Sequence, residues 1–145
     1  MEALQAHIRQ TVLKEFTEQA GEKVNAVIRR YIQTRFYDQY SPEWYQRMYQ
    51  LLRSVTTARA VPCDGGYEVE VYLDPDKARY VSHWSDKAVE SAYVFRRASE
   101  GHHGNAAQTD GRFIDDAAAD IQRGKAYDIV RDFKAYLKQY GLKVQ

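Results

Sequence analysis

The chain has little cysteine, no long apolar run and almost no net charge, and each shortage excludes a class of protein. Cys63 is the single cysteine among 145 residues, so the chain has no internal disulfide framework and no CxxC metal motif. Twenty-one Lys and Arg against 20 Asp and Glu leave a formal net charge of +1, which disfavours non-specific nucleic-acid binding by phosphate neutralisation.

Membrane insertion and secretion are also disfavoured. No stretch approaches the roughly 18 apolar residues that a membrane-spanning helix needs. The segment MEALQAHIRQ at residues 1–10 has neither the basic flank nor the apolar core of a signal peptide. We therefore expect a soluble chain with no membrane partner.

Tyrosine, in contrast, is abundant. The sequence holds 12 Tyr within an aromatic content of 13%, which is more than a core of this size needs. Tyr combines a rigid apolar ring with a polar tip, so surplus tyrosines suggest contact surfaces. With 44% hydrophobic residues the chain can fill one core, and we expect a single domain over 1–145, made of a helical segment 1–36 and an α+β body 37–145.

The segment from Ala3 to about Phe36 has no proline and a helical spacing of apolar residues. Those residues are Leu4, Ile8, Val12, Leu13, Phe16, Val24, Val27, Ile28, Tyr31 and Ile32. Steps of strictly four residues drift by about 40° around a helix, so the apolar stripe must be re-phased, and Gly21 is the expected place. The segment is either one long helix with a weak point or two helices that meet near Ala20 and Gly21.

The segment YDQYSP, Tyr37 to Pro42, ends this helix, because the residue before a proline is pushed out of the helical region. Ser41 can then cap a short helix from Pro42 to about Arg53.

A β-hairpin is predicted next. The β-branched run SVTTARAV precedes PCDGG, which supplies turn residues, and then YEVEVYL alternates apolar and polar side chains from Tyr67 to Leu73. Asp74 with Pro75 ends the second strand. A two-stranded ribbon is only marginally stable alone, so it must pack on helices or join strands of a neighbouring subunit.

Three further helices and one long loop complete the prediction. The helices are expected at Asp86–Arg97 with Ser85 as a possible cap, around Phe113–Ile121 up to Gly124, and around Ile129–Tyr140 up to Gly141. The loop GHHGNAAQTDG spans Gly101–Gly111. The predicted fold class is therefore α+β, with a long N-terminal helix and C-terminal helices packed on a small antiparallel hairpin or sheet.

No catalytic constellation emerges. The polar residues considered are His83, His102, His103, Asp110, Asp115 and Asp116 as metal ligands, Cys63 as a nucleophile, and the carboxylate pairs Asp74 with Asp76 and Asp115 with Asp116. Adjacent histidines in a glycine-flanked loop hold a metal poorly, Cys63 has no nearby base and is expected to be structural, and the paired acids suit caps and turns. We expect no metal, no cofactor and no enzymatic activity.

The tyrosine-rich segment carries a family resemblance. The residues Tyr37, Tyr40, Ser41, Pro42, Tyr45, Arg47, Leu51, Leu52 and Ser54 resemble the Y-x-x-Y-x-P-x-x-Y-x-R-T-x-x-L-L-x-S pattern of small virion proteins of tailed phages and prophages, with Met48 where that family often has Thr. Gly101, His103, Gly104, Gly111 and Phe113 are similar to the family's G-x-H-G and G-x-F segment, and Leu137, Lys138, Tyr140 and Gly141 to its closing L-K-x-x-G. The resemblance covers about residues 31–141.

This resemblance implies a structural role in head-tail joining, tail completion or the neck, or as a minor tail protein. Proteins of this kind are α+β and tend to assemble as rings around the DNA channel. The implied partners are copies of the chain itself and neighbouring head and tail proteins, with DNA at most passing through a channel. The implied location is the virion, assembled in the cytoplasm of the bacterial host. In a ring, the doublets Arg29–Arg30 and Arg96–Arg97 could line a channel with positive charge.

Residues of the YSPEWY turn and of the long loop are the expected contacts with neighbours, because loops on a rigid frame commonly carry function. The interface residues predicted are Tyr37, Tyr40, Trp44, Tyr45, His102 and His103. Trp44 is the best single anchor, with core packing of the short helix as an equal alternative.

Two other functions remain open at this point. One is a small metal-dependent or nucleic-acid-processing enzyme that uses His83, His102 and His103, which would require these residues to converge in one pocket. The other is a toxin, antitoxin or regulatory module of a mobile element, which the near-neutral charge weakens.

Overall fold

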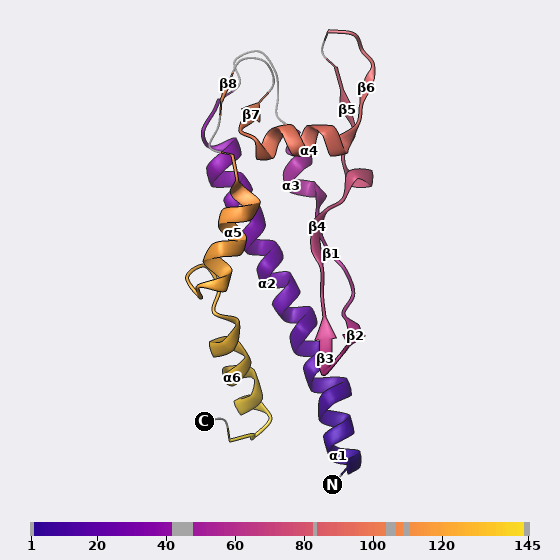
Figure 1. Cartoon of the computed structure of the whole chain (residues 1–145), viewed down its shortest axis with the longest axis vertical. Helices are drawn as coiled ribbons and strands as arrows, with labels where there is room; N and C mark the ends of the chain where they lie inside the picture. Colours follow the sequence, from indigo (N-terminus) through magenta and orange to yellow (C-terminus); the bar gives the residue numbers. More distant parts are fainter. Residues whose placement is uncertain (1, 42–47, 83, 104–106, 109–110, 144–145) are drawn as a thin grey trace.

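The computed structural model of the chain describes residues 2–41, 48–82, 84–103, 107–108 and 111–143. The molecule is elongated, with a long helical rod flanked by a β-ribbon on one side and by two C-terminal helices on the other (Figure 1). It mixes helices with small antiparallel sheets, which confirms the predicted α+β fold class.

The N-terminal rod is one uninterrupted helical run. It consists of α1 (Glu2–His7), the π-helical segment η1 (Ile8–Leu13), α2 (Lys14–Ile32) and a second π-helical segment, η2 (Gln33–Tyr37). The first of the two alternatives is thus correct, but the weak point expected at Gly21 is wrong, because Gly21 lies buried inside α2. The helix widens at η1 and η2 instead, and π-helical turns shift the phase of the side chains that follow them.

The predicted hairpin is present and packs on α2. Its strands are β1 (Val55–Thr57), β2 (Val61–Cys63), β3 (Gly66–Glu68) and β4 (Val71–Leu73), with β1 paired to β4 and β2 to β3. The Ala58 N–H donates to the Glu70 carbonyl at 2.8 Å, which joins the two paired sections into one structure. We call residues 55–73 the ribbon. Its turn passes through Gly65, whose φ of +81° favours glycine.

A second hairpin replaces part of a predicted helix. Strands β5 (Tyr80–Val81) and β6 (Ala88–Val89) pair antiparallel, and the Ser82 N–H donates to the Lys87 carbonyl at 2.8 Å. The helix predicted from Asp86 therefore begins only at Ser91, as α4 (Ser91–Ser99). Ser85 lies in the hairpin turn, so it does not cap this helix.

The helix predicted over Pro42 to about Arg53 is described only at its end. It appears as α3 (Gln50–Ser54), and Tyr49 before it has a left-handed backbone with φ of 53°. The helical conformation therefore does not continue back through Tyr49. Residues 42–47 lie outside the described part of the chain.

Between the two hairpins lies a short 3₁₀ turn, η3 (Pro75–Lys77), which Asp74 caps by accepting from the Asp76 N–H at 3.0 Å. This confirms the turn role predicted for the Asp74 and Asp76 pair.

The C-terminal half follows the prediction closely. Short strands β7 (His102–His103) and β8 (Ala107–Gln108) pair within the predicted loop. They are followed by α5 (Phe113–Gln122) and α6 (Ile129–Gln139), and the turns after these helices contain Gly124 and Gly141, both with positive φ.

Two apolar clusters hold these elements together. The larger one joins the second half of α2 and η2 to the ribbon, α3, α4 and α5, and Ile32 and Phe113 are fully buried in it. The smaller one joins η1 and the first half of α2 to α6 through Val12, Phe16 and Tyr136. The C-terminal helix is thus attached to the rod by a core of its own.

Candidate functional site

One of the predicted interface residues belongs to the core of the chain itself. Tyr37 is only 5% exposed and packs against Phe36 and Tyr49, with ring centroids 5.2 and 4.8 Å away. The chain therefore uses Tyr37 for its own core, which corrects the expectation that its ring faces a neighbour. Tyr40 is half-buried.

The other members of that set are placed as follows. Trp44 and Tyr45 lie outside the described residues, so neither alternative for Trp44 is tested. His102 is half-buried, and it forms β7 together with His103.

The residues considered as metal ligands form no cluster in the part of the chain that the structure describes. His83 and Asp110 lie outside the described part of the chain, and among the residues within it no three His, Cys, Asp or Glu side chains come together. Asp116 instead forms an ion pair with Arg35. Cys63 is exposed at the end of β2, so packing in the core does not account for it.

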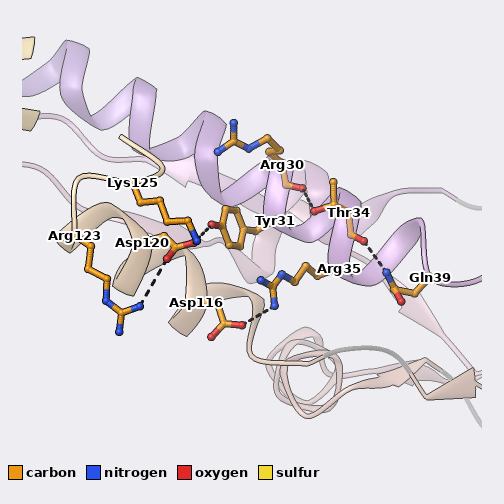
Figure 2. A network of polar contacts seen from close by, with 9 residues as sticks. All are labelled: Arg30, Tyr31, Thr34, Arg35, Gln39, Asp116, Asp120, Arg123 and Lys125. Atoms are coloured by element: carbon orange, nitrogen blue, oxygen red, sulfur yellow. Dashed lines mark hydrogen bonds and ion pairs between the residues drawn. The ribbon is translucent and has the colours of Figure 1, made fainter. Parts of the chain in front are cut away.

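The most developed polar arrangement lies between α2 and α5 (Figure 2). The Tyr31 hydroxyl donates a hydrogen bond to Oδ2 of Asp120. One helical turn away, Nη1 of Arg35 contacts Oδ2 of Asp116 at 2.8 Å. Asp116 and Asp120 are four residues apart on α5, so both carboxylates lie on the face that meets the rod.

Cations surround this pair of contacts. Arg123 Nη1 and Lys125 Nζ lie 4.0 and 3.9 Å from the carboxylate of Asp120. The guanidinium groups of Arg30 and Arg35 lie 5.9 and 5.5 Å from the centre of the Tyr31 ring, within the range of cation–π attraction. We call these seven residues the α2–α5 cluster, namely Arg30, Tyr31, Arg35, Asp116, Asp120, Arg123 and Lys125.

The contacts shift the pKa values of the central pair in opposite directions. The hydrogen bond from Tyr31 holds the pKa of Asp120 below its ordinary value of 3.8, and Lys125 and Arg123 lower it further. The same hydrogen bond raises the pKa of Tyr31 above 10.0. Asp120 is therefore ionised and Tyr31 neutral at physiological pH.

Asp120 is much less exposed than the two cations beside it. The Asp120 side chain is 15% exposed, whereas those of Arg123 and Lys125 are 75% and 76% exposed. Four cations stand against two carboxylates, so the cluster has a net charge of +2. We call Arg123 and Lys125, the two exposed cations beside Asp120, the basic patch.

The outer face of the ribbon carries the opposite charge. Thr57 and Val69 face Gly21 of α2, so the alternation of a strand turns Glu68 and Glu70 to the other side. Both glutamates are exposed, as is Tyr72 beyond them. The ribbon contains three Asp and Glu, namely Asp64, Glu68 and Glu70, against one basic residue, Arg59.

Neither charged surface was singled out from the sequence. The acidic one could have been, because the three acids of the ribbon lie within residues 64–70. The basic patch could not, since its neighbour Asp120 is engaged by Tyr31, 89 positions away in the sequence, and only the packing of α5 on α2 makes that contact.

A set of hydrogen bonds and an ion pair joins α6 to the rod. The hydroxyls of Tyr136 and Tyr140 both lie 3.1 Å from Oε2 of Glu15. Lys23 Nζ lies 2.6 Å from Oδ2 of Asp132, and this contact holds the pKa of Asp132 below its ordinary value. The hydrogen bonds to Glu15 and the ion pair of Lys23 lie at the same interface as the smaller apolar cluster.

Comparisons with known proteins identify the family of the chain. No curated protein and no solved structure matches the chain, and no helix within the described residues is long and apolar enough to cross a membrane. The YomN family, which is associated with Bacillus prophages, matches residues 1–139. The match covers nearly the whole chain and agrees with the expected phage origin. The protein therefore belongs to the prophage-associated YomN family.

Proposed function

We propose that the protein is a non-enzymatic structural component of a tailed-phage or prophage virion, acting in head-tail joining, tail completion or the neck. In this role it contacts copies of itself, as a ring, and neighbouring head and tail proteins. Membership of a prophage-associated family supports the phage setting, and the shape of the molecule supports the structural role.

The observation that carries the proposal is the apolar surface on two extended hairpins. On the β5–β6 hairpin, Val81 is 62% and Trp84 is 85% exposed, and on the ribbon Val61 is 48% and Tyr72 is 40% exposed. The β5–β6 hairpin extends beyond the body of the molecule at the end opposite the chain termini (Figure 1). Exposed aromatic and aliphatic side chains on projecting elements are typical of surfaces that become buried on assembly.

Removal of the protein from a prophage that encodes it tests this function. After induction of a strain with an early stop codon in the coding sequence, we expect unjoined heads and tails, or tails of defective length, in electron micrographs. Supplying the protein in trans should restore infectious particles. Normal virions from the mutant would contradict the proposal.

A second experiment connects the role to the hairpin. We expect Trp84→Ala to fail in the complementation assay, whereas Lys87→Ala on the same hairpin should restore particles. Mass spectrometry of purified virions should also detect the protein. Its absence from complete particles would contradict a structural role.

Metal analysis separates this proposal from the enzyme hypothesis. Protein purified without an affinity tag should contain no stoichiometric transition metal. A bound metal that is lost in a His102→Ala, His103→Ala variant would instead favour a metal-dependent activity.

A further inference from the structure

We propose that neighbouring copies associate side by side, with the acidic outer face of the ribbon of one copy against the basic patch of the next. This inference rests on the proposed function, because it assigns the contact through which the chain would form a ring. The partner is a second copy of this chain, and the argument for it is charge complementarity between two surfaces that the same chain carries.

The acidic surface is available for such a contact. Glu68 and Glu70 are exposed, and neither has an ion-pair partner among the residues that the structure describes. Two like charges on one face of a strand repel each other. Cations from outside the chain would relieve this repulsion.

The cations of the basic patch are also available for such a contact. The carboxylates that partly balance it are already engaged, because Asp120 accepts from Tyr31 and Asp116 pairs with Arg35. Arg123 and Lys125 reach Asp120 only at 4.0 and 3.9 Å, the outer limit of an ion pair, and remain about three-quarters exposed. Their charge therefore remains available to an incoming carboxylate.

The two surfaces lie on different sides of the rod, which determines the kind of assembly. Gly21 faces the ribbon, whereas Tyr31, which donates to Asp120 of α5, follows it by ten residues, a rotation of about 280° at 100° per residue. Figure 1 shows the ribbon and α5 on different sides of α2. A contact between different surfaces of identical chains is heterologous, so it repeats from copy to copy and closes into a ring when the rotation allows.

Surface charge alone gives specificity rather than tight binding. Tyr72, 40% exposed on the same face as Glu68 and Glu70, supplies apolar area and a ring on which a guanidinium can stack. Opposite charges on two faces also agree with the net charge of +1 for the whole chain, since a heterologous assembly requires each copy to carry both halves of the contact.

Charge reversal tests the contact directly. The ribbon variant is Glu68→Lys with Glu70→Lys, and the patch variant is Arg123→Glu with Lys125→Glu. Light scattering and sedimentation over a concentration series measure self-association, and circular dichroism verifies that each variant is folded. We expect each variant to associate about tenfold or more weakly than the original chain, and added salt to weaken the original chain.

Mixing the two variants gives the sharper result. In an equimolar mixture the ribbon of each variant can meet a patch of opposite sign on the other variant, so alternating assemblies should form at concentrations where neither variant assembles alone. The control is Lys134→Glu with Lys138→Glu on α6, which reverses two exposed lysines elsewhere and should associate like the original chain.

Three outcomes would overturn the inference. They are a chain that stays monomeric at every concentration, variants that assemble like the original chain, and a patch variant that fails while the ribbon variant does not. The last result would assign the patch to another partner, such as nucleic acid. None of these outcomes affects the virion experiments, so failure of this contact is distinguishable from failure of the proposed function.

Discussion

Gly21 of α2 lies so close to Val69 of the ribbon that a Cβ atom on Gly21 would come within 2.9 Å of the Cγ2 atom of Val69. The Cγ2 atom of Thr57 would be equally close, at 2.9 Å. Both neighbours are β-branched and have little freedom to turn away. Because Gly21 has no side chain, the ribbon can pack closely against the rod at this point.

Replacing Gly21 with alanine should therefore destabilise the protein. In an unobstructed helix, Gly→Ala stabilises by about 1 kcal/mol, but overpacking at a buried contact costs about 1–3 kcal/mol. We expect a net loss of about 1 kcal/mol in the free energy of unfolding, measured by urea denaturation. Gln19→Ala, at an exposed position of α2, is the control and should change little. A Gly21→Ala protein more stable than the original would show that ribbon and rod do not pack this closely.

Tyr31→Phe should lower the free energy of unfolding at neutral pH. It should also make that free energy change less as the pH is lowered into the acid range. Because Tyr31 holds the pKa of Asp120 below 3.8 in the folded protein, the unfolded chain binds the proton more readily. The stabilisation is thus present above about pH 4 and is lost as the pH falls through the folded pKa.

Urea unfolding from pH 7 downwards should show the gap between original and variant closing, and an NMR titration should show the pKa of Asp120 rising toward its ordinary value. Tyr93→Phe, at an exposed tyrosine of α4, is the control. An unchanged Asp120 titration in the Tyr31→Phe protein would argue against the hydrogen bond.

Tyr80→Phe should leave the protein equally stable or make it more stable. Among the described residues, the Tyr80 hydroxyl is buried without a hydrogen-bond partner, and burial raises its pKa above 10.0. Its ring packs edge-on against Phe95 at 6.2 Å, a contact that phenylalanine retains. Thermal unfolding measures the effect, and Tyr136→Phe, which removes a hydroxyl bonded to Glu15, should be destabilising by comparison. A clear loss of stability in Tyr80→Phe would reveal a partner for the hydroxyl.

Phe16→Ala should loosen α6 more than α5. Phe16 is 8% exposed, and its ring lies 4.7 Å from that of Phe133 and 5.4 Å from that of Tyr136. Truncation of a buried phenylalanine costs about 3–5 kcal/mol, and here the loss falls on the smaller apolar cluster. Amide exchange in α6 should become much faster while α5 keeps its protection. Equal loss of protection in both helices would mean that the two clusters unfold as one unit.

The sequence predicted those elements whose local signals agree with their surroundings. The ribbon has strict alternation and a glycine turn, and α5 and α6 each have an apolar face and a terminal glycine. The β5–β6 hairpin was missed because its strands are only two residues long, too short for an alternating pattern, and its turn, around Asp86, also resembles a helix start. Tertiary contacts fix it instead, with Tyr80 packed on Phe95 and the Ser91 hydroxyl donating to the Ala78 carbonyl at 2.8 Å.

By itself, the sequence determined the α+β class, the continuous N-terminal helix as one of two alternatives, the ribbon and the phage association, because these follow from periodicity, turn residues and motifs that are local in the chain. Only the tertiary structure decided that Gly21 contacts the ribbon, that Tyr37 is buried, and that Asp120, beside Arg123 and Lys125, accepts a hydrogen bond from Tyr31. Each of these depends on contacts between residues tens of positions apart, and such contacts arise from the packing of whole elements, which no local pattern of residues encodes.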